Sequence, residues 1–339
     1  MSGAPEFGIV VVHRSASPYL AVCLEQARRC NPHVPVVLAG DASNAAFAVD
    51  RFVAIDQLPR SAAHTQFLRC YRHYSPSQSL LWERFCIERW FVVLAVMELE
   101  GFERVLALDS DVLLFCDAAE EAQRCAAYAV ALNHWDGQRA LPHCTFIQRR
   151  EALEEFCALV SATYASEHRL EELKQRNQKR LGRHWISDMS LWHAWAMTTA
   201  RPVLIRERLG EEPAIYDSCI EHVRGFEAVN PLPLLVRPWK RLVFEQGRAY
   251  GFRRHDGRRV RLLCVHYHGR FKALMGRHAR GQADGLVAAL VLLRLKLAEL
   301  PLKALRNWRS YLRRLLAGPP APDRTPAPRP LQEDQEPRS

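Results

Sequence analysis

The sequence predicts an α/β fold built on a mostly parallel sheet, and three observations lead to that class. Short apolar runs alternate with longer amphipathic segments through the first half of the chain. Segments of that length between strands are typical of crossover helices, which place successive strands parallel. The chain has 339 residues, 48% of them hydrophobic and 25% charged, so it can bury one substantial core.

The expected elements of the first half follow from these runs in chain order. The four apolar runs predict strands at 7–12, 34–39, 52–55 and 104–109. The amphipathic segments predict helices at about 18–30 and 82–97.

The second half continues with a strand at 128–132, a helix at about 151–164 and a tryptophan-rich helix within 185–197. Trp192 and Trp195 recur at helical spacing, and we expect them in the core rather than at a ligand. No element is predicted for the very polar stretch that precedes the tryptophan-rich helix.

A hairpin is expected at 241–252, where Gln246 and Gly247 supply a turn signal between two strand-like pieces. A last strand is expected within 258–268, and the domain at 1–275 is expected to end there.

Two further regions are predicted after this domain. Residues 276–317 are expected to form basic amphipathic helices broken at Pro301, because proline cannot donate into the helical ladder. From 302 to 316, leucines and Trp308 fall on one side of the helix and basic residues on another, which is typical of a helix lying on an anionic membrane surface. The alternative is that these helices cover the sheet or form a dimer contact. The Pro-rich tail at 318–339 has almost nothing to bury and is expected to be disordered.

The net charge, the cysteines and the N-terminal residues indicate which partners the chain favours and in which cellular compartment it is expected. Lysine and arginine number 47 against 37 acidic residues, a net charge of +10 that favours anionic partners. The ten cysteines are scattered through apolar segments without a framework spacing, so we expect reduced core residues. We find no signal-peptide pattern and no run of about 20 apolar residues. These observations predict a cytoplasmic chain, peripheral at most on the inner face of the membrane.

The stretch "RVLALDSDVLLFCD" at 104–117 places Asp109 and Asp111 directly after a predicted strand. Ligands of open α/β sheets bind beyond the carboxyl ends of the strands. Carboxylates two residues apart can hold Mg²⁺ or Mn²⁺, and such ions often keep phosphates as further ligands. The pair is therefore a candidate anchor for a diphosphate, and a solvated turn after the strand is the alternative.

The stretch "HYHGRFK" at 266–272 closes the domain after the last apolar run. His266 could complete an Asp-based metal site, Gly269 lets the backbone approach a ligand, and Lys272 could meet a phosphate as a point charge. A surface strand end with incidental His and Lys remains the alternative. A zinc site with Cys264 is disfavoured, because no second thiol pair at zinc-finger spacing accompanies it.

Together these two stretches resemble the GT-A class of nucleotide-sugar glycosyltransferases, and in particular glycosyltransferase family 8. Members of that family carry an apolar strand, a D-x-D and a late H-F-x-G-x-x-K. "LDSD" and "HYHGRFK" match these elements in the same order, with Tyr267 in place of the usual Phe. The resemblance covers roughly residues 7–275.

The resemblance implies a set of site residues around a metal and a nucleoside-diphosphate sugar. Mn²⁺ or Mg²⁺ would be bound by Asp109, Asp111 and His266. The donor's diphosphate would be contacted by Asp109, Ser110, Asp111, Gly269 and Lys272.

Three further assignments follow from the same resemblance. Arg89 lies where such enzymes place a donor-contacting arginine, although a solvated helix face is an equal alternative. Asp188 falls where the family contacts the transferred sugar and is the candidate catalytic residue. Met189 stands where a Gln is expected, and Asp188 could instead be the N-cap of its helix. The loop at 13–20 lies where the class places the nucleotide base and ribose.

The resemblance therefore implies a metal-dependent, hexosyl-type transferase, retaining by similarity, that acts on a glycan or lipid-linked acceptor in bacterial surface polysaccharide synthesis. A haloacid-dehalogenase-like phosphatase is one alternative, since "LALDSDVLL" also resembles its nucleophile strand. In that class the motif comes from the first strand and a second acidic pair follows, and the chain has no Asp-Asp pair. The other alternative is a non-catalytic basic protein that binds a membrane or nucleic acid. We expect no nucleic-acid partner, because the basic residues form no aromatic-interleaved patch.

Overall fold

The computed structural model describes residues 6–47, 50–75, 78–135, 139–206, 214–233 and 235–298. The chain divides into two compact units, Met1–Leu293 and Arg294–Ser339. All labelled helices and strands belong to the first unit. The amphipathic helix predicted at 302–316 and the tail predicted at 318–339 lie outside the described residues.

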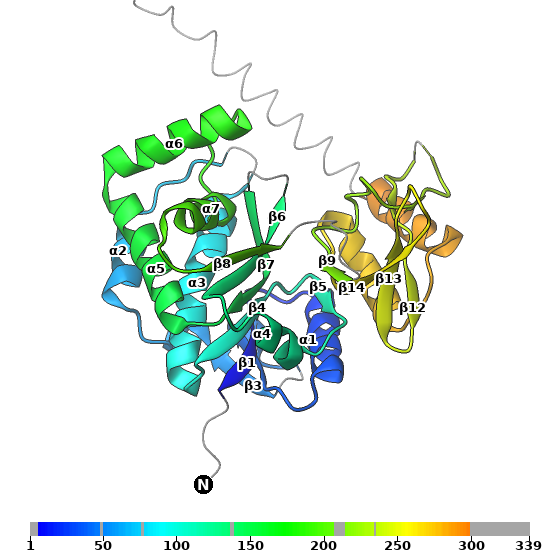
Figure 1. Ribbon diagram of the computed structural model, residues 1–339, viewed down its shortest axis with the longest axis horizontal. Coiled ribbons are helices and arrows are strands. Elements are labelled where there is room, and N and C mark those ends of the chain that lie inside the picture. Colours follow the sequence, from blue (N-terminus) through cyan, green and yellow to red (C-terminus); the bar gives the residue numbers. More distant parts are fainter. Residues whose placement is uncertain are drawn as a thin grey trace, which may run out of the picture. The chain divides into compact units, whose positions relative to one another are not determined.

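The first unit is organised around a seven-stranded sheet (Figure 1). Its strands, in spatial order, are β3 (Arg51–Ala54), β2 (Val36–Gly40), β1 (Phe7–His13), β4 (Arg104–Leu108), β7 (Arg139–Ile147), β6 (Val130–Trp135) and β8 (Val203–Arg206). Neighbours pair in parallel from β3 to β4 and between β6 and β8, whereas β7 runs antiparallel to β4 and β6. The predicted α/β class with a mostly parallel sheet is confirmed.

Helices cover both faces of the seven-stranded sheet, so its strands are buried on both sides. Ile9 and Val11 of β1 join a core cluster with α1 (Pro18–Cys30), whereas Val10 joins the cluster under α3 (Leu80–Glu100). This alternation is the two-residue period of a strand. The face under α3 also carries α2 (Ala62–Cys70), α5 (Arg150–Ala165), α6 (Glu167–Leu181) and α7 (Asp188–Thr198), and the face under α1 carries α4 (Ala118–Arg124).

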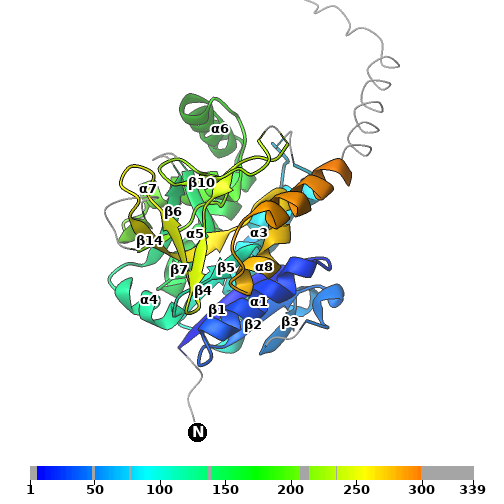
Figure 2. The same cartoon turned by 90° about the vertical axis from the view of Figure 1, so that its right-hand side faces the viewer.

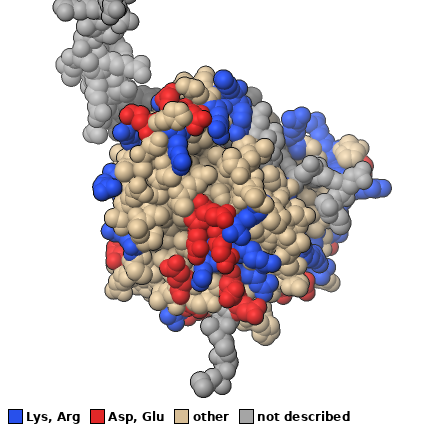
Figure 3. All heavy atoms as spheres, turned by 60° about the vertical axis from the view of Figure 1, so that its left-hand side comes forward, with Lys and Arg blue, Asp and Glu red and all other residues tan. Residues whose placement is uncertain are grey.

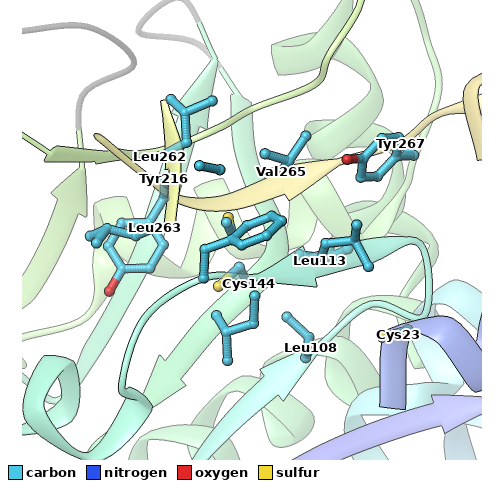
Figure 4. Close-up of a cluster of buried hydrophobic side chains, with 14 of the residues drawn as sticks. Cys23, Leu108, Leu113, Cys144, Tyr216, Leu262, Leu263, Val265 and Tyr267 are labelled. Carbon is cyan, nitrogen blue, oxygen red and sulfur yellow. The ribbon is translucent and has the colours of Figure 1, made fainter. Parts of the chain in front are cut away.

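A second sheet brings the two sequence motifs together. It consists of β12 (Val243–Glu245), β13 (Arg248–Phe252), β14 (Arg259–His266) and β5 (Val112–Leu114), with β9 (Ala214–Tyr216) also paired to β14. β5 starts directly after the D-x-D, and Leu113 lies opposite Val265 of β14 within a buried apolar cluster (Figure 4). Residues more than 150 positions apart in the sequence therefore become neighbours.

The strands and helices expected within 1–275 are all present among the described residues, with a few shifted bounds. The hairpin turn is confirmed, since Gln246 and Gly247 adopt the left-handed φ angles of 49° and 74°. Trp192 and Trp195 are buried, as predicted. All ten cysteines are free, and seven of them are buried. The sequence did not predict α2, α4, α6, β5, β7, β8 or β9.

The remaining elements are short or follow the last strand. They are η1 (Ala42–Asn44), η2 (Ile55–Gln57), the pair β10 (Ala228–Val229) and β11 (Trp239–Lys240), η3 (Gly269–Leu274) and α8 (Met275–Ala279). Figure 2 shows α8 beside α1, and residues 286–298 form a further helix. Ala288, Ala289 and Leu292 of that helix belong to the buried core, so the first unit continues beyond Met275. No helix in the part of the chain that the structure describes is both long and apolar enough to cross a membrane.

Candidate active site

The D-x-D forms a tight turn between β4 and β5. The amide of Asp109 donates to the carbonyl of His143 at 2.9 Å, and the amide of Val112 donates to the carbonyl of Asp109 at 3.1 Å. The amide of Tyr267 donates to the carbonyl of Asp111 at 2.8 Å. The backbones of both motifs and of β7 are thus fixed to one another, which positions their side chains.

Two cations face Asp111. His266 Nε2 lies 3.4 Å from Asp111 Oδ1, and Lys272 Nζ lies 2.9 Å from Asp111 Oδ2. Burial opposes ionisation, but the charges of His266 and Lys272 outweigh it and hold the pKa of Asp111 well below its ordinary value. Burial likewise disfavours the imidazolium, but Asp111 raises the pKa of His266 to about 9. Without another ligand, this half of the site is a buried ionic cluster.

Gly269 explains how Lys272 reaches Asp111. It begins η3 with a left-handed φ of 57°, a conformation that favours glycine. The short helix then carries Lys272 back toward the D-x-D turn, where its ammonium also lies 4.7 Å from the ring centre of Tyr19.

His266 is held by two neighbours besides Asp111. Its Nδ1 lies 2.9 Å from the carbonyl oxygen of Ser218, so this nitrogen carries the proton and donates it. The ring of His143 stacks on that of His266, with centroids 4.5 Å apart and 11° between the planes. Burial and the charge of His266 keep the pKa of His143 well below its ordinary value. His268 instead lies beside Glu221 and is largely exposed.

Arg89 faces Asp109 on the opposite side of the turn. Its guanidinium bonds to Asp109 and, at 2.8 Å, to Asp188 Oδ2. Burial and the nearby Asp111 raise the pKa of Asp109 to about 6 despite the charge of Arg89. Arg89 is thus no solvated residue of a helix face, and the structure shows it bridging two carboxylates.

Asp188 is the first residue of α7 and not its N-cap. Ser187 occupies the cap position and forms a capping box with Ser190, which leaves the Asp188 carboxylate to bind Arg89. The alternative interpretation of Asp188 as an N-cap was therefore wrong, and the sequence-predicted residue does lie in the site.

The loop after β1 forms the next part of the site. His13 Nδ1 lies 2.9 Å from Ser110 Oγ, which ties the middle residue of the D-x-D to this loop. Ser15 has a left-handed φ of 70°. Its amide donates to Asp41 Oδ2 at 2.7 Å, and its carbonyl accepts from Asn44 Nδ2 at 2.9 Å. Backbone held in such a conformation by its neighbours is common at ligand sites.

The predicted metal ligands fit a divalent ion in part. His266 donates through Nδ1 and directs Nε2 at Asp111, which is the orientation a metal-ligating histidine adopts. Asp109 is turned toward Arg89 instead. Within the described ranges, no group of three or more His, Cys, Asp or Glu side chains is gathered closely enough to hold a metal. Asp111 and His266 are directed at one another as two ligands of one ion would be, and metal binding by these residues and Asp109 stays a prediction.

Most of these charged and polar side chains line one cleft of about 580 Å³. Its polar lining includes His13, Arg14, Ser15, Arg89, Asp109, Ser110, Asp111, His143, Asp188, His266, His268 and Lys272. Its apolar lining includes Leu81, Trp82, Phe85, Cys86, Leu141, Pro142 and Met189. Of the predicted metal-binding, donor-binding and catalytic residues, Gly269 alone does not line the cleft. The sequence did not indicate His143 or the apolar lining, because β7 was not predicted and isolated Leu, Trp and His residues carry no motif.

No family model matches the chain, and no curated protein matches it in sequence. Among solved structures, it is similar to mouse xyloside xylosyltransferase 1 in its apo form, at 9% identity and a TM-score of 0.41, over 59% of this chain and 84% of that one. It is also similar to the galactosyltransferase LgtC in complex with donor and acceptor sugar analogs, at 11% identity and a TM-score of 0.32, over 59% and 73%. A third is CMP:2-keto-3-deoxy-manno-octonic acid synthetase complexed with CTP, at 13% identity and a TM-score of 0.34, over 60% and 90%. Likenesses this distant define neither the family nor the activity of the chain.

Proposed function

We propose that the protein is a glycosyltransferase of the GT-A class that moves a sugar from a nucleoside diphosphate to a glycan or lipid-linked acceptor. The observation that carries the proposal is the joining of the D-x-D turn to "HYHGRFK". His266 Nε2 and Lys272 Nζ lie 3.4 Å and 2.9 Å from the carboxylate oxygens of Asp111, and all three residues line one cleft. This set combines carboxylate, imidazole and ammonium groups where a diphosphate could be neutralised.

In the proposed reaction an acceptor oxygen forms a bond to the anomeric carbon while the bond from that carbon to the diphosphate breaks. The electron pair of the broken bond leaves with the diphosphate, and the acceptor hydroxyl proton passes to the diphosphate or to water. Lys272 stabilises the charge that develops on the leaving group, and it is already aimed at the turn. Asp188 lines the same cleft and shares Arg89 with Asp109, and there it would contact the transferred sugar.

A divalent ion, Mn²⁺ or Mg²⁺, would be held by Asp111 and His266, with Asp109 of the same D-x-D as the third proposed ligand. When bound, it supplies positive charge to the diphosphate oxygens. The chain's own part is to keep Nε2 of His266 directed at Asp111 through the bond to the Ser218 carbonyl. The bond between Ser110 and His13 fixes the loop that would meet the nucleotide.

A phosphatase of the haloacid-dehalogenase kind is less well supported by the same residues. Its nucleophilic aspartate must be free to attack, whereas Asp109 is bonded to Arg89. β4, which carries the motif, also comes after three earlier strands in the chain.

A non-catalytic basic protein is also less well supported. On the face that carries α2, α5 and α6, acidic and basic side chains are interspersed and separated by uncharged surface (Figure 3). A nucleic-acid surface would gather basic side chains into one continuous field.

The experiment that tests the proposal is a screen of nucleotide sugars with Mn²⁺, read as release of free nucleoside diphosphate. We expect one nucleotide sugar to be hydrolysed slowly without acceptor and the release to stop when EDTA removes the metal. Release from no member of a panel of UDP-, GDP-, ADP- and CDP-sugars would contradict the proposal.

We further propose that the protein acts on the inner face of a membrane, because the basic amphipathic pattern at 302–316 suits an anionic surface. Each basic residue near such a surface contributes about 1 kcal/mol. We therefore expect the full chain to co-sediment with anionic liposomes and to be released by salt. A truncation after Ala298 keeps the buried residues of the preceding helix and should not sediment. Equal sedimentation of the truncated and full chains would contradict the membrane role.

A further inference from the structure

The mouth of the cleft carries an exposed apolar surface that the reacting groups do not explain. Leu80, Leu81 and Trp82 form the first turn of α3 and are 49%, 67% and 48% exposed. This turn is fixed in place, because the side chain of the N-cap Ser79 accepts from the amide of Trp82 at 3.3 Å. Leu81 and Trp82 also line the cleft. Three consecutive large apolar side chains are thus presented to solvent on a rigid element.

This surface leads directly to the reacting groups. Leu81, Phe85 and Arg89 follow one another at intervals of four residues and so lie on one face of α3. Phe85 and Cys86 line the cleft between the exposed turn and Arg89. At a rise of 1.5 Å per residue, the path from Trp82 to Arg89 is about 10 Å long. Its outer end is apolar, and its inner end is the charged pair of Arg89 with Asp188.

The composition of this path indicates what it binds. A nucleotide sugar carries a polar sugar and a charged diphosphate, which fit the polar lining of the cleft with Lys272 and His266. Leu81 and Phe85 offer no hydrogen bonds, and Met189 adds a further flexible apolar side chain to the cleft. The Arg14 guanidinium lies 5.5 Å from the ring centre of Phe85. Leu81, Trp82, Phe85 and Met189 nevertheless present mostly apolar surface, which suits an alkyl or prenyl chain more than the hydroxyl groups of a second sugar.

We propose that the apolar path from Leu81 and Trp82 to Phe85 is an acceptor subsite for the apolar aglycone of an amphiphilic acceptor. The acceptor's sugar end then lies at Asp188, and its apolar chain leaves the cleft over the first turn of α3. This inference rests on the proposed function, because it takes the second substrate of that reaction as the occupant.

The test compares methyl and octyl glycosides of the same sugar, with the octyl compounds kept below their micelle concentrations. Calorimetric titrations use pairs built on glucose, galactose and mannose. In the wild type we expect the best octyl glycoside to bind at least about tenfold more tightly than its methyl partner, because several methylenes become buried. In the double variant Leu81→Ser/Trp82→Ser we expect this ratio to fall below threefold.

Leu99→Ser is the matched control, since Leu99 is a 53% exposed leucine near the other end of the same helix. We expect it to keep the wild-type ratio. Circular dichroism and thermal unfolding establish that each variant is folded, and the single variant Trp82→Ser replaces the double variant if the latter is not.

Three results would overturn the inference. Octyl and methyl glycosides could bind equally to the wild type, the Leu81→Ser/Trp82→Ser variant could keep the ratio, or Trp82→Ser could weaken both members of a pair alike, as stacking on a sugar would require. Failure of the proposed function is read separately, because it appears as absence of nucleoside diphosphate release from every donor. Donor turnover without a preference for octyl glycosides would refute the aglycone subsite alone.

Discussion

The two carboxylates of the D-x-D lie one residue apart, yet their surroundings are opposite. Asp111 faces two cations from the end of β14 and from η3, and its pKa is lowered. Asp109 faces Arg89 of α3, and burial raises its pKa to about 6. The D-x-D spacing therefore does not make the two residues equivalent. Their roles depend on the elements that fold against each side of the turn.

We therefore assign charge neutralisation to Asp111 with its two cations. We assign a fixed ionic framework to Asp109, Arg89 and Asp188. The first should affect turnover most and the second should affect folding most. Four substitutions test this division.

The largest effect is expected for Asp111→Asn. It removes the carboxylate shared by His266 and Lys272, and loss of one such electrostatic partner lowers the rate by roughly 10² to 10³. The measurement is nucleoside diphosphate release per folded molecule, with Asp256→Asn on a surface turn as the control. Full activity in a folded Asp111→Asn variant would remove the basis of the proposed site.

Arg89→Ala tests the framework on the other side. It leaves the mostly buried carboxylates of Asp109 and Asp188 without their cation, which is expected to lower the free energy of unfolding by about 3 kcal/mol. Arg104→Ala is the control, because its partner Glu6 is exposed and such surface pairs contribute at most about 1 kcal/mol. Similar losses in urea unfolding for both variants would show that Arg89 does not hold the framework.

Glu83 offers a pH-dependent test of the same region. Its side chain is buried, and burial together with the charge of Asp188 raises its pKa to about 7 from 4.5. Because the folded protein keeps this proton while the unfolded chain releases it, the free energy of unfolding falls as the pH rises from about 4.5 through 7.

Glu83→Gln removes the buried charge. We therefore expect it to be more stable than the wild type at pH 8, by on the order of 2 kcal/mol, with little difference near pH 4.5. Glu103→Gln, at an exposed position, should change neither value. Equal stability of Glu83→Gln and the wild type at pH 8 would show that Glu83 is not held as a buried acid.

The smallest effects are expected from a pair of histidines. His266→Ala should raise the Mn²⁺ concentration for half-maximal activity about tenfold, since His266 directs Nε2 at Asp111. His268→Ala should change it less than twofold, because His268 is largely exposed and lies beside Glu221. Equal shifts for both variants in an Mn²⁺ titration would mean that the motif register is wrong.

Sequence patterns predicted much of the fold and the polar half of the site. The alternation of apolar runs predicted the β1 to β4 strands, because buried parallel strands read as continuous apolar segments. The two motifs predicted Asp109, Asp111, His266 and Lys272, and their approach in space depends on the pairing of β5 with β14. That pairing joins two short segments by long-range contacts, so no local sequence pattern predicts it.

The other half of the site depends on which faces of helices point into the cleft. From the sequence, a solvated helix face and a ligand contact are equal alternatives for Arg89. The structure excludes the solvated face, because α7 places Asp188 beside Arg89. The exposure of Leu81 and Trp82 likewise follows from where α3 begins over the cleft. Such positions are set by tertiary packing, which a single sequence does not reveal.

The most direct test of the account is nucleotide binding to the wild-type protein. Calorimetric titration with UDP, GDP, ADP and CDP is carried out in Mn²⁺ and again in EDTA, with an unstructured RNA as the competing ligand. We expect one nucleotide to bind at least about tenfold more tightly in Mn²⁺ than in EDTA, and we expect Asp111→Asn to remove this difference. Salt-sensitive binding to the RNA with no metal-dependent affinity for any nucleotide would contradict it.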